Sequence, residues 1–552
     1  EPADRYGRRT FLTRGARTAA AVGLAGVGAP AILEGCGTST GATVATPGVS
    51  SLKPRSGGTV TIGVNSEING FLPSTSHWDN TGLTYANTVF DSLTQVAADG
   101  TAKPYLAQAV TPNPDKTVWT ITLRPNVMFH DGSPLNADVI VANFEALRAS
   151  PLTAQAVTPI SGVAATGPLE VTVTCKEPLV AFPHYLATQV GYPVALAQLE
   201  KNDTQHPIGT GPFSIVSWEP NDHFTVQRNP HYWRNNLPYL DSITFKPIAS
   251  DNSREASLRS GTIDLMLTRD PHAIQGLRNN PGFQQIADLH RSVGQTDSDF
   301  IILNCAAEPT NDITVRQAMA YALNVDELVR LFGAGVTTPN LSLFPPGSPY
   351  RPSDNGYPTY DLNKAKQLVA QAAPNHGGAI KLTLATITDP RLLTQIQAVS
   401  NMWELAGMQV SVNTVLQVEF IDNLVTGAFQ AYTDEMFGAS DPDLNYVWLS
   451  STTAGGPGSI ALNFARNKDD VLEAALQEGR TQSDPAARAA AYQTVDKQLA
   501  KDLPYLWVSR ATWSLTGSNA VMNFDNLTLP DGSRAQGFAG GIFTPTPMWR
   551  RA

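Results

Sequence analysis

The sequence has only three cysteines among 552 residues, which excludes a disulfide-stapled scaffold and a cysteine-rich metal array. No two of its nine histidines share a zinc-ligand spacing, so we expect no histidine-ligated metal site. Basic residues number 38 against 48 acidic ones, and the net charge of −10 argues against nucleic acid, whose phosphates need a basic face. With 42% apolar residues the chain can bury real cores, and its length suggests about two to four domains.

Signatures of catalysis are also missing. The sequence contains no Gly-x-Ser-x-Gly elbow, no His-Glu-x-x-His pair, and no Gly-x-Gly-x-x-Gly that opens a helix after a strand. Cys175 and Cys305 are isolated, each beside an expected strand, and we expect both to be small buried side chains. These absences argue against an enzyme and against a bound cofactor. An exported hydrolase or redox enzyme is kept as the alternative class.

The first 36 residues have the features of an export signal. Arg8-Arg9-Thr10-Phe11-Leu12 is a twin-arginine pattern, and the apolar run that follows at 18–33 is too short for a membrane span. The run closes with Leu33-Glu34-Gly35-Cys36, which resembles the bacterial lipobox, although Glu34 is an unusual neighbour there. We expect a signal at residues 1–35, then a lipidated Cys36 and flexible tether at residues 36–56. The protein would then be anchored on the extracytoplasmic face of the cell membrane.

The rest of the chain alternates strand and helix patterns, which predicts an α/β fold in at least two bodies. Apolar and polar residues alternate at 59–64 and 118–123, as in half-buried strands. Asn136, Asn324 and Asp361 stand where helix N-caps are expected. Further strands are expected at 169–174, 223–227, 242–245, 300–303, 382–385 and 408–412. Further helices are expected at 392–405, 471–478 and 485–499.

Several motifs in order resemble the solute-binding proteins of peptide-type ABC importers, a family that includes dipeptide, oligopeptide and nickel binders. The densest match is at residues 119–134, from Trp119 through Phe129-His130-Asp131-Gly132 to Pro134. The other matching segments are residues 90–93, 99–107, 207–213, 217–220, 228–233, 261–264, 315–318 and 441–443. Each is weak alone, but together they extend over nearly the whole chain after the tether.

These motifs are expected to be structural. His130 beside Asp131 suggests a general base, but the following Gly132 favours a strand that runs into a turn. Gly209-Thr210-Gly211 lacks the lysine and the strand–loop–helix context of a phosphate-binding loop. The aromatic residues at 232 and 233 follow a proline and are expected to cover the edge of a core.

The resemblance implies two α/β lobes joined by two strands, with an extra subdomain on the first lobe, that close on a ligand by a hinge. The expected boundaries are residues 57–92, 206–295 and 512–552 for lobe I, 93–205 for the subdomain and 296–511 for lobe II. The implied activity is capture of a peptide or peptide-like solute and its delivery to a permease and its ATPase subunits. Such receptors act as monomers. A transport-independent sensor or envelope protein on the same fold is a further alternative.

In peptide-binding members that the chain resembles, an aspartate four residues before the proline of the acidic-Pro step binds the peptide amino group. Counting back from Pro442 places Gly438 there, so a free-amine peptide loses its main anchor unless Asp434 or Asp441 replaces it. The departure points to modified peptides, glycans or other polyols, although the family makes peptide the first expectation. By the same resemblance, Arg391 is the candidate for the ligand carboxylate.

Other candidate ligand contacts are inferred from their position in the chain. Glu67, Asn69 and Phe71 lie in the loop after the first strand, and α/β sheets place ligands at the carboxyl ends of their strands. Further wall residues are expected at Trp78, Phe437, Ser440, Asn445 and Trp448.

Overall fold

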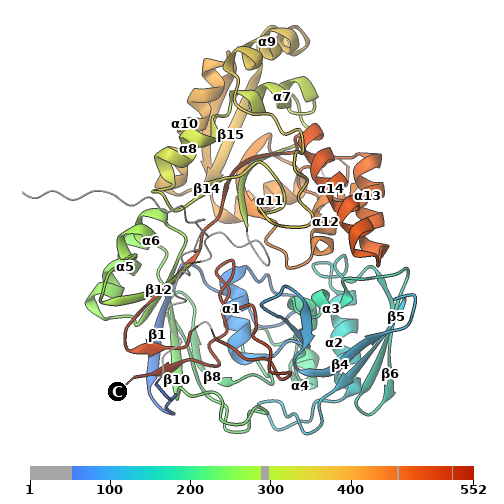
Figure 1. Cartoon of the computed structure of the whole chain (residues 1–552), viewed down its shortest axis with the longest axis vertical. Coiled ribbons are helices and arrows are strands. Elements are labelled where there is room, and N and C mark those ends of the chain that lie inside the picture. The colour runs from blue at the N-terminus through green and yellow to red at the C-terminus, as the bar shows by residue number, and fades with distance from the viewer. Residues whose placement is uncertain (1–51, 288–296, 457–458, 525, 552) are drawn as a thin grey trace, which may run out of the picture. The chain divides into compact units, whose positions relative to one another are not determined.

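The computed structural model describes residues 52–287, 297–456, 459–524 and 526–551. The expected signal, the lipidation site Cys36 and the tether as far as residue 51 lie outside the described residues. Within those ranges, no helix has the length and apolar character needed to cross a bilayer. The described chain forms three large sheets with their helices (Figure 1).

Lobe I, as named here, is a seven-stranded sheet with its helices, in the order β12-β19-β11-β1-β10-β9-β8. Its strands are β1 (Thr59–Val64), β8 (Phe213–Glu219), β9 (His223–Arg228), β10 (Ser242–Pro247), β11 (Leu265–Thr268), β12 (Phe283–Ala287) and β19 (Ser514–Ser518). Its helices are α1 (Asn80–Val89), α5 (Asp251–Ser260) and α6 (Pro271–Leu277). The central strand β1 runs parallel to β10 and β11, so the carboxyl ends of all three point to one edge.

Lobe II is a six-stranded sheet with its helices, in the order β14-β18-β13-β17-β15-β16. Its strands are β13 (Ser298–Leu303), β14 (Thr338–Pro339), β15 (Lys381–Ile387), β16 (Gln409–Val415), β17 (Ala431–Met436) and β18 (Tyr505–Arg510). Its helices are α7 (Ile313–Ala322), α8 (Val325–Phe332), α9 (Leu362–Ala372), α10 (Pro390–Leu405), α11 (Gln417–Thr426), α12 (Tyr446–Leu449), α13 (Asp470–Thr481) and α14 (Pro485–Asp502). The expected caps are confirmed, since Asn324 accepts from Glu327 N and Asp361 from Lys364 N.

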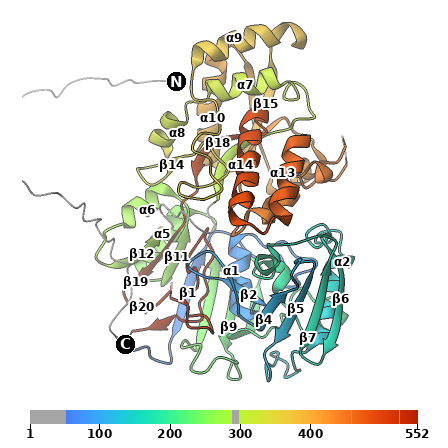
Figure 2. The same cartoon turned by 45° about the vertical axis from the view of Figure 1, so that its right-hand side comes forward.

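The subdomain is an antiparallel four-stranded sheet in the order β4-β5-β7-β6. It consists of β4 (Ala107–Pro112), β5 (Val118–Leu123), β6 (Ile160–Gly167), β7 (Glu170–Cys175), α2 (Ala137–Ala149), α3 (Phe182–Tyr185) and α4 (Leu196–Lys201). Asn136 caps α2, as expected. Short strands complete the fold: β2 (Thr94–Val96) with β3 (Ala102–Pro104), and β20 (Val521–Met522) with β21 (Trp549–Arg550). The four-stranded sheet lies to the right of β1 in both views (Figure 2).

The α/β class expected from the sequence is confirmed. The chain crosses between the two larger sheets from β12 to β13 and again from β18 to β19, where residues 511–513 connect the strands. The seven-stranded sheet is therefore built from three separate stretches of sequence, and the six-stranded sheet from one. The expected domain boundaries themselves stay a prediction.

Three of the sequence motifs meet at the buried carboxylate of Asp91. It accepts hydrogen bonds from Thr210 Oγ1 at 3.1 Å, Tyr232 O–H at 2.9 Å and Trp233 Nε1–H at 2.8 Å. Burial raises the pKa of Asp91 to about 6, and the three donors oppose that shift. These bonds hold the chain after α1 against the loops before β8 and after β9.

The Gly-x-Gly and histidine motifs belong to the same junction. A Cβ on Gly209 would lie 2.0 Å from the carbonyl oxygen of Val89, so only glycine allows this approach. The backbone N–H of His130 donates to the Gly209 carbonyl, and its Nε2 lies 3.0 Å from the Gly211 carbonyl. The expected structural role of these residues is confirmed.

Asp91→Ala is expected to lower the free energy of unfolding by about 3–5 kcal/mol, because it leaves three buried donors without their acceptor. Asp91→Asn keeps one acceptor oxygen and is expected to cost less. Denaturant unfolding of the purified variants measures both effects. Asp115→Asn, which removes an exposed carboxylate from the β4–β5 turn, is the control and is expected to leave stability unchanged. If Asp91→Ala and Asp115→Asn lower the free energy of unfolding by the same amount, the role assigned to Asp91 is wrong.

Candidate functional site

A cavity of about 930 Å³ lies between lobe I and lobe II. From lobe I it is lined by the loops that follow β1, β10 and β11, and from lobe II by residues at the ends of β15 and β17. Its position is the one expected for a ligand in α/β sheets, beyond the carboxyl ends of parallel strands. The segment 511–513, which connects the lobes, also lines it.

The lobe I side of the cavity is held rigid by its own hydrogen bonds. Asp79 caps α1 by accepting from Gly82 N at 2.7 Å. Trp78 stacks on Phe90 with ring centroids 6.0 Å apart and donates its Nε1–H to a backbone carbonyl at 2.9 Å. The Glu67 carboxylate accepts from Trp218 Nε1–H at 2.8 Å and from a backbone N–H of the β8–β9 turn at 2.7 Å. These contacts fix the shape of this wall.

The lobe II side carries a group of apolar side chains that we call the apolar wall. It comes from α8, α10 and α11, whose buried faces continue into the core of lobe II. The apolar wall consists of Leu328, Val329, Phe332, Ile396, Val399, Phe420, Ile421 and Leu424. Such a surface binds the apolar part of a ligand without directional contacts.

One arginine connects the two lobes across the cavity. Arg269 follows β11 in lobe I and forms ion pairs with Glu435 on β17 and, at 3.5 Å, with Asp299 on β13. Asp299 and Glu435 lie directly opposite each other in the β13–β17 ladder, where two like charges repel. Burial lowers the pKa of the Arg269 guanidinium, and Asp299 opposes that shift. The guanidinium therefore neutralises both carboxylates.

Gly438 packs against the carboxylate of Asp297, a residue that was not among the expected ligand contacts. A Cβ at Gly438 would stand 2.2 Å from Asp297 Oδ1, so the backbone at 438 approaches the carboxylate at a position closed to any side chain. Asp297 is 9% exposed, lines the cavity and accepts from Asn80 Nδ2–H of lobe I at 2.8 Å. Burial raises its pKa above the usual value.

Asp434 also faces the cavity, near the end of β17. Its Oδ1 accepts from the backbone N–H of Glu435 at 2.8 Å, and it forms no ion pair within the described ranges. Burial raises the pKa of Asp434 to about 7; Arg269 opposes the shift and Asp297 adds to it. It is therefore a partly buried carboxylate with no ion pair among the described residues, on which Arg269 acts only from beyond ion-pair distance.

Four of the expected site residues line the cavity: Glu67, Trp78, Arg391 and Asp434. Arg391 lies at the start of α10, with Nη2 3.9 Å from Asp389, the residue that caps this helix. Their contact with a ligand stays a prediction.

The other expected residues contact protein groups and are not among the side chains that line this cavity. Asn69 accepts from His77 N, Phe71 packs on Trp218 and Phe224, Phe437 packs on Phe300, and Trp448 packs on Phe464. Ser440 lies 3.1 Å from His184 Nδ1, and Asn445 is buried. Asp441 binds Arg488 through both oxygens, at 2.7 and 2.9 Å, so it already has a cationic partner.

Neither metal binding nor thiol chemistry is indicated by the described residues. No group of three or more histidine, cysteine or acidic side chains in these ranges is arranged to hold a metal ion. Burial raises the pKa of both Cys175 and Cys305 to about 11, which leaves them as unreactive thiols near neutral pH.

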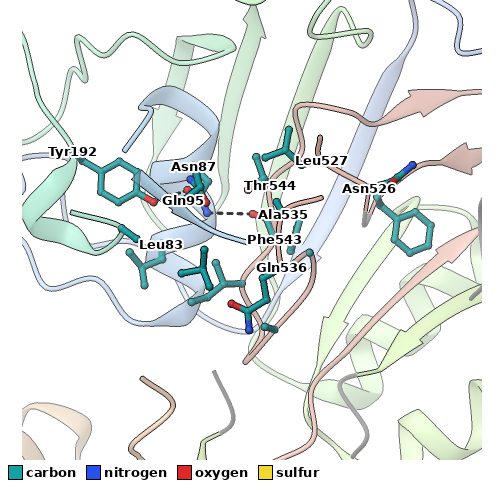
Figure 3. A pocket seen from close by; sticks show the side chains of 16 residues that line it. Leu83, Asn87, Gln95, Tyr192, Asn526, Leu527, Ala535, Gln536, Phe543 and Thr544 are labelled. Carbon is teal, nitrogen blue, oxygen red and sulfur yellow. Dashed lines mark hydrogen bonds between the residues drawn. The ribbon is translucent and has the colours of Figure 1, made fainter. Parts of the chain in front are cut away.

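A second, much smaller cavity of about 70 Å³ lies in lobe I between α1 and the C-terminal segment (Figure 3). Asn87 accepts from Tyr192 O–H and donates to the carbonyl of Phe543 at 3.5 Å. At this size the cavity has room for water rather than for a solute.

Gly438→Ala is expected to destabilise the protein by about 1–3 kcal/mol, because the new methyl group overlaps Asp297. Thermal unfolding measures the effect. Gly276→Ala is the matched control: a Cβ there meets nothing within 4 Å, and alanine suits a helix such as α6. A Gly438→Ala protein as stable as the control contradicts the close packing of residues 438 and 297.

Comparison with known proteins gives one consistent result. The family model for bacterial extracellular solute-binding proteins, family 5 (middle region), matches residues 101–458. The glutathione-binding protein GsiB of Salmonella typhimurium is 28% identical over 449 residues, covering 78% of this chain and 84% of that protein.

Solved structures of periplasmic binding proteins are similar to this chain in fold as well. The periplasmic binding protein DppA of Helicobacter pylori, in complex with the peptide STSA, has a TM-score of 0.77 at 20% identity, over 90% of this chain and 99% of that one. The oligopeptide-binding protein AppA of Bacillus subtilis, in complex with a nonapeptide, has a TM-score of 0.77 at 21% identity, over 91% and 100%. The chain therefore has the two-lobe fold of periplasmic binding proteins.

Proposed function

The chain belongs to the family 5 bacterial extracellular solute-binding proteins, and from this premise we propose that it is a receptor for a peptide or peptide-like solute. The receptor traps the solute between its lobes and delivers it to the permease and ATPase subunits of an ABC importer. The observation that carries the proposal is the cavity of about 930 Å³ lined from both lobes. Its volume is at the upper end of the range for small-molecule sites, roughly 300–1,000 Å³, and suits a short peptide.

The chemistry of the cavity supports a peptide-like solute. Arg391 provides a guanidinium for a carboxylate, and Asn80 and Thr81 provide polar groups near the start of α1. The apolar wall provides contact for side chains. A micromolar solute requires only about −8 kcal/mol of binding free energy, which a few such contacts supply.

The two chain crossings support closure by a hinge. Binding proteins of this architecture rotate their lobes about a few residues at the connecting strands. The connection at 511–513 is short, and Trp513 at its end lines the cavity. A ligand that contacts both lobes favours the closed arrangement by its differential affinity for it.

The sequence of the first 56 residues supports export by a twin-arginine route and lipid anchoring at Cys36. Residues 37–56 then act as a tether of about 25 Å root-mean-square length, which keeps the receptor close to its permease. The acidic, exported body acts as a monomer.

Short peptides are expected to stabilise the purified protein against heat. A peptide at one hundred times its dissociation constant adds about 2.7 kcal/mol, which corresponds to a rise in Tm of about 2–3 °C for a chain of this size. A thermal-shift screen with peptides of two to five residues, sugars and metal chelates measures this. Stabilisation by sugars or chelates alone overturns the peptide assignment, and turnover of any compound overturns the receptor.

Cys36→Ala is expected to release the protein from the membrane fraction of the cells that make it, because no diacyl chain is then attached. Fractionation with an antibody, together with incorporation of labelled fatty acid, measures the change. Cys305→Ala, which removes a thiol in lobe II, is the control and is expected to leave both unchanged. A membrane-bound Cys36→Ala protein contradicts lipid anchoring.

A further inference from the structure

The ionisable groups that line the cavity are mostly acidic. They are Glu67, Asp79, Asp251, Asp297, Asp299, Asp389, Asp434 and Glu435 against Arg254, Arg269 and Arg391. Six of the eight carboxylates have clear partners within the protein: two cap helices α1 and α10, one holds the β8–β9 turn, one pairs with Arg254, and two pair with Arg269. Asp297 and Asp434 are left with no cation in ion-pair distance among the described residues.

Asp434 stands among apolar groups. It lies opposite Phe300 in the β13–β17 ladder, so the two side chains share a face of the sheet. Phe300 packs on Phe437, Tyr505 and Trp507. Burial raises the pKa of Tyr505, and the charge of Asp434 adds to that shift. A carboxylate in such surroundings is costly to ionise unless a cation reaches it.

Asp297 adds a second negative charge to the same part of the cavity. It accepts hydrogen bonds from Asn80 Nδ2–H and from the Gly438 backbone N–H, but both donors are neutral. Burial raises the pKa of Asp434, and the negative charge of Asp297 adds to that shift. A bound cation relieves this repulsion at both carboxylates.

We propose that the cavity selects solutes that carry an ammonium or guanidinium group on an apolar stem, with Asp434 as the counter-ion of that group. This deepens the proposed function and rests on it: within the class of peptides, the preferred ones contain a basic side chain. A lysine or arginine side chain has the required form, a chain of methylene groups ending in a charge. Its stem lies along the apolar wall while its charge reaches the carboxylate.

Anionic solutes and neutral apolar solutes fit the lining of the cavity less well than cationic ones. An anionic solute would meet a lining with eight carboxylates and three arginines, each of which already has a carboxylate in ion-pair distance within the protein. A neutral apolar solute would leave Asp434 desolvated and without a partner. A cationic group is the one that lowers the electrostatic energy of the site.

The test compares two sets of alanine-based peptides, two to five residues long, which contain either one lysine or norleucine in its place. Norleucine keeps the four-carbon stem and removes only the ammonium group. By calorimetry on the full-length protein, the best lysine peptide is expected to bind at least about tenfold more tightly than its norleucine partner, an effect of about 1.4 kcal/mol. In Asp434→Asn the ratio is expected to fall to about one.

Asp422→Asn is the matched control. It removes one carboxylate from the exposed side of α11 in the same lobe, so it changes the long-range charge equally without touching the cavity lining. It is expected to keep the full lysine preference. Asp434→Asn is itself expected to fold, since it removes a desolvated charge, and its Tm at pH 8 should equal or exceed that of the wild type.

Each outcome decides a different question. Equal affinity of the lysine and norleucine peptides for the wild type overturns the selectivity but leaves the peptide receptor standing. A lysine preference that persists in Asp434→Asn overturns the assignment of the counter-ion. Binding of neither set overturns the peptide receptor and the selectivity with it.

A pH series provides a second readout. The titratable groups that act on Asp434 are Arg269 from lobe I and Asp297, which directly precedes β13, and Asp434 in turn acts on Tyr505 from β18. Asp299 and Glu435 form the next pair of the β13–β17 ladder, whose side chains point to the other face of the sheet and pair with Arg269. Because the pKa of Asp434 is raised to about 7, a cationic peptide must displace a proton below that pH. Affinity for the lysine peptide is therefore expected to rise from pH 5.5 to 8 in the wild type and to stay flat in Asp434→Asn. A rise of equal size in the variant contradicts the proposal.

Discussion

The guanidinium group of Arg269 joins lobe I to lobe II by ion pairs with two carboxylates of lobe II. Two strands of lobe II place Asp299 and Glu435 side by side, an arrangement that is unfavourable without a cation between them. The cation comes from the other lobe, at the end of β11. Without Arg269, these two partly buried carboxylates would repel each other with no cation between them. Trp513, in the connecting segment, donates to Glu435 at 3.2 Å and so ties the hinge to the same group.

This constraint also shapes the chemistry of the cavity. Because Arg269 pairs with two other carboxylates, it offsets only part of the effect of burial, which raises the pKa of Asp297 and Asp434. The close approach of Gly438 to Asp297 affects the cavity in the same way. The carboxylate of Asp297, which directly precedes β13, occupies the space that a side chain at position 438 would need. At Gly438, where the resemblance to peptide binders implies an aspartate, the acidic group beside the backbone thus comes from Asp297.

Much of the fold is predictable from the sequence because its signals are local. Strands β1 and β5 appear at the residues where apolar and polar side chains alternate, and three helices begin at the asparagine or aspartate expected to cap them. The site is only partly predictable, because its contacts are not local. Glu67 was predicted because it lies in the loop after the first strand, at the carboxyl end of the sheet, and it lines the cavity. Asp297 lies 141 positions before Gly438 and has no local signal in the sequence. Asp441 looks equally available in the sequence, yet it pairs with Arg488 on α14.

The subdomain and lobe II meet along a seam made of hydrogen bonds. Tyr185 O–H donates to Asp443 at 3.1 Å, His184 Nδ1 lies 3.1 Å from Ser440 Oγ, and the backbone N–H of residue 180 donates to the carbonyl of Arg480 at 3.3 Å. Water can replace each of these partners when the surfaces part. An apolar seam would instead lose about 25 cal/mol for every Å² exposed. A seam of polar contacts can be opened and resealed at little cost, which is what the proposed receptor would require.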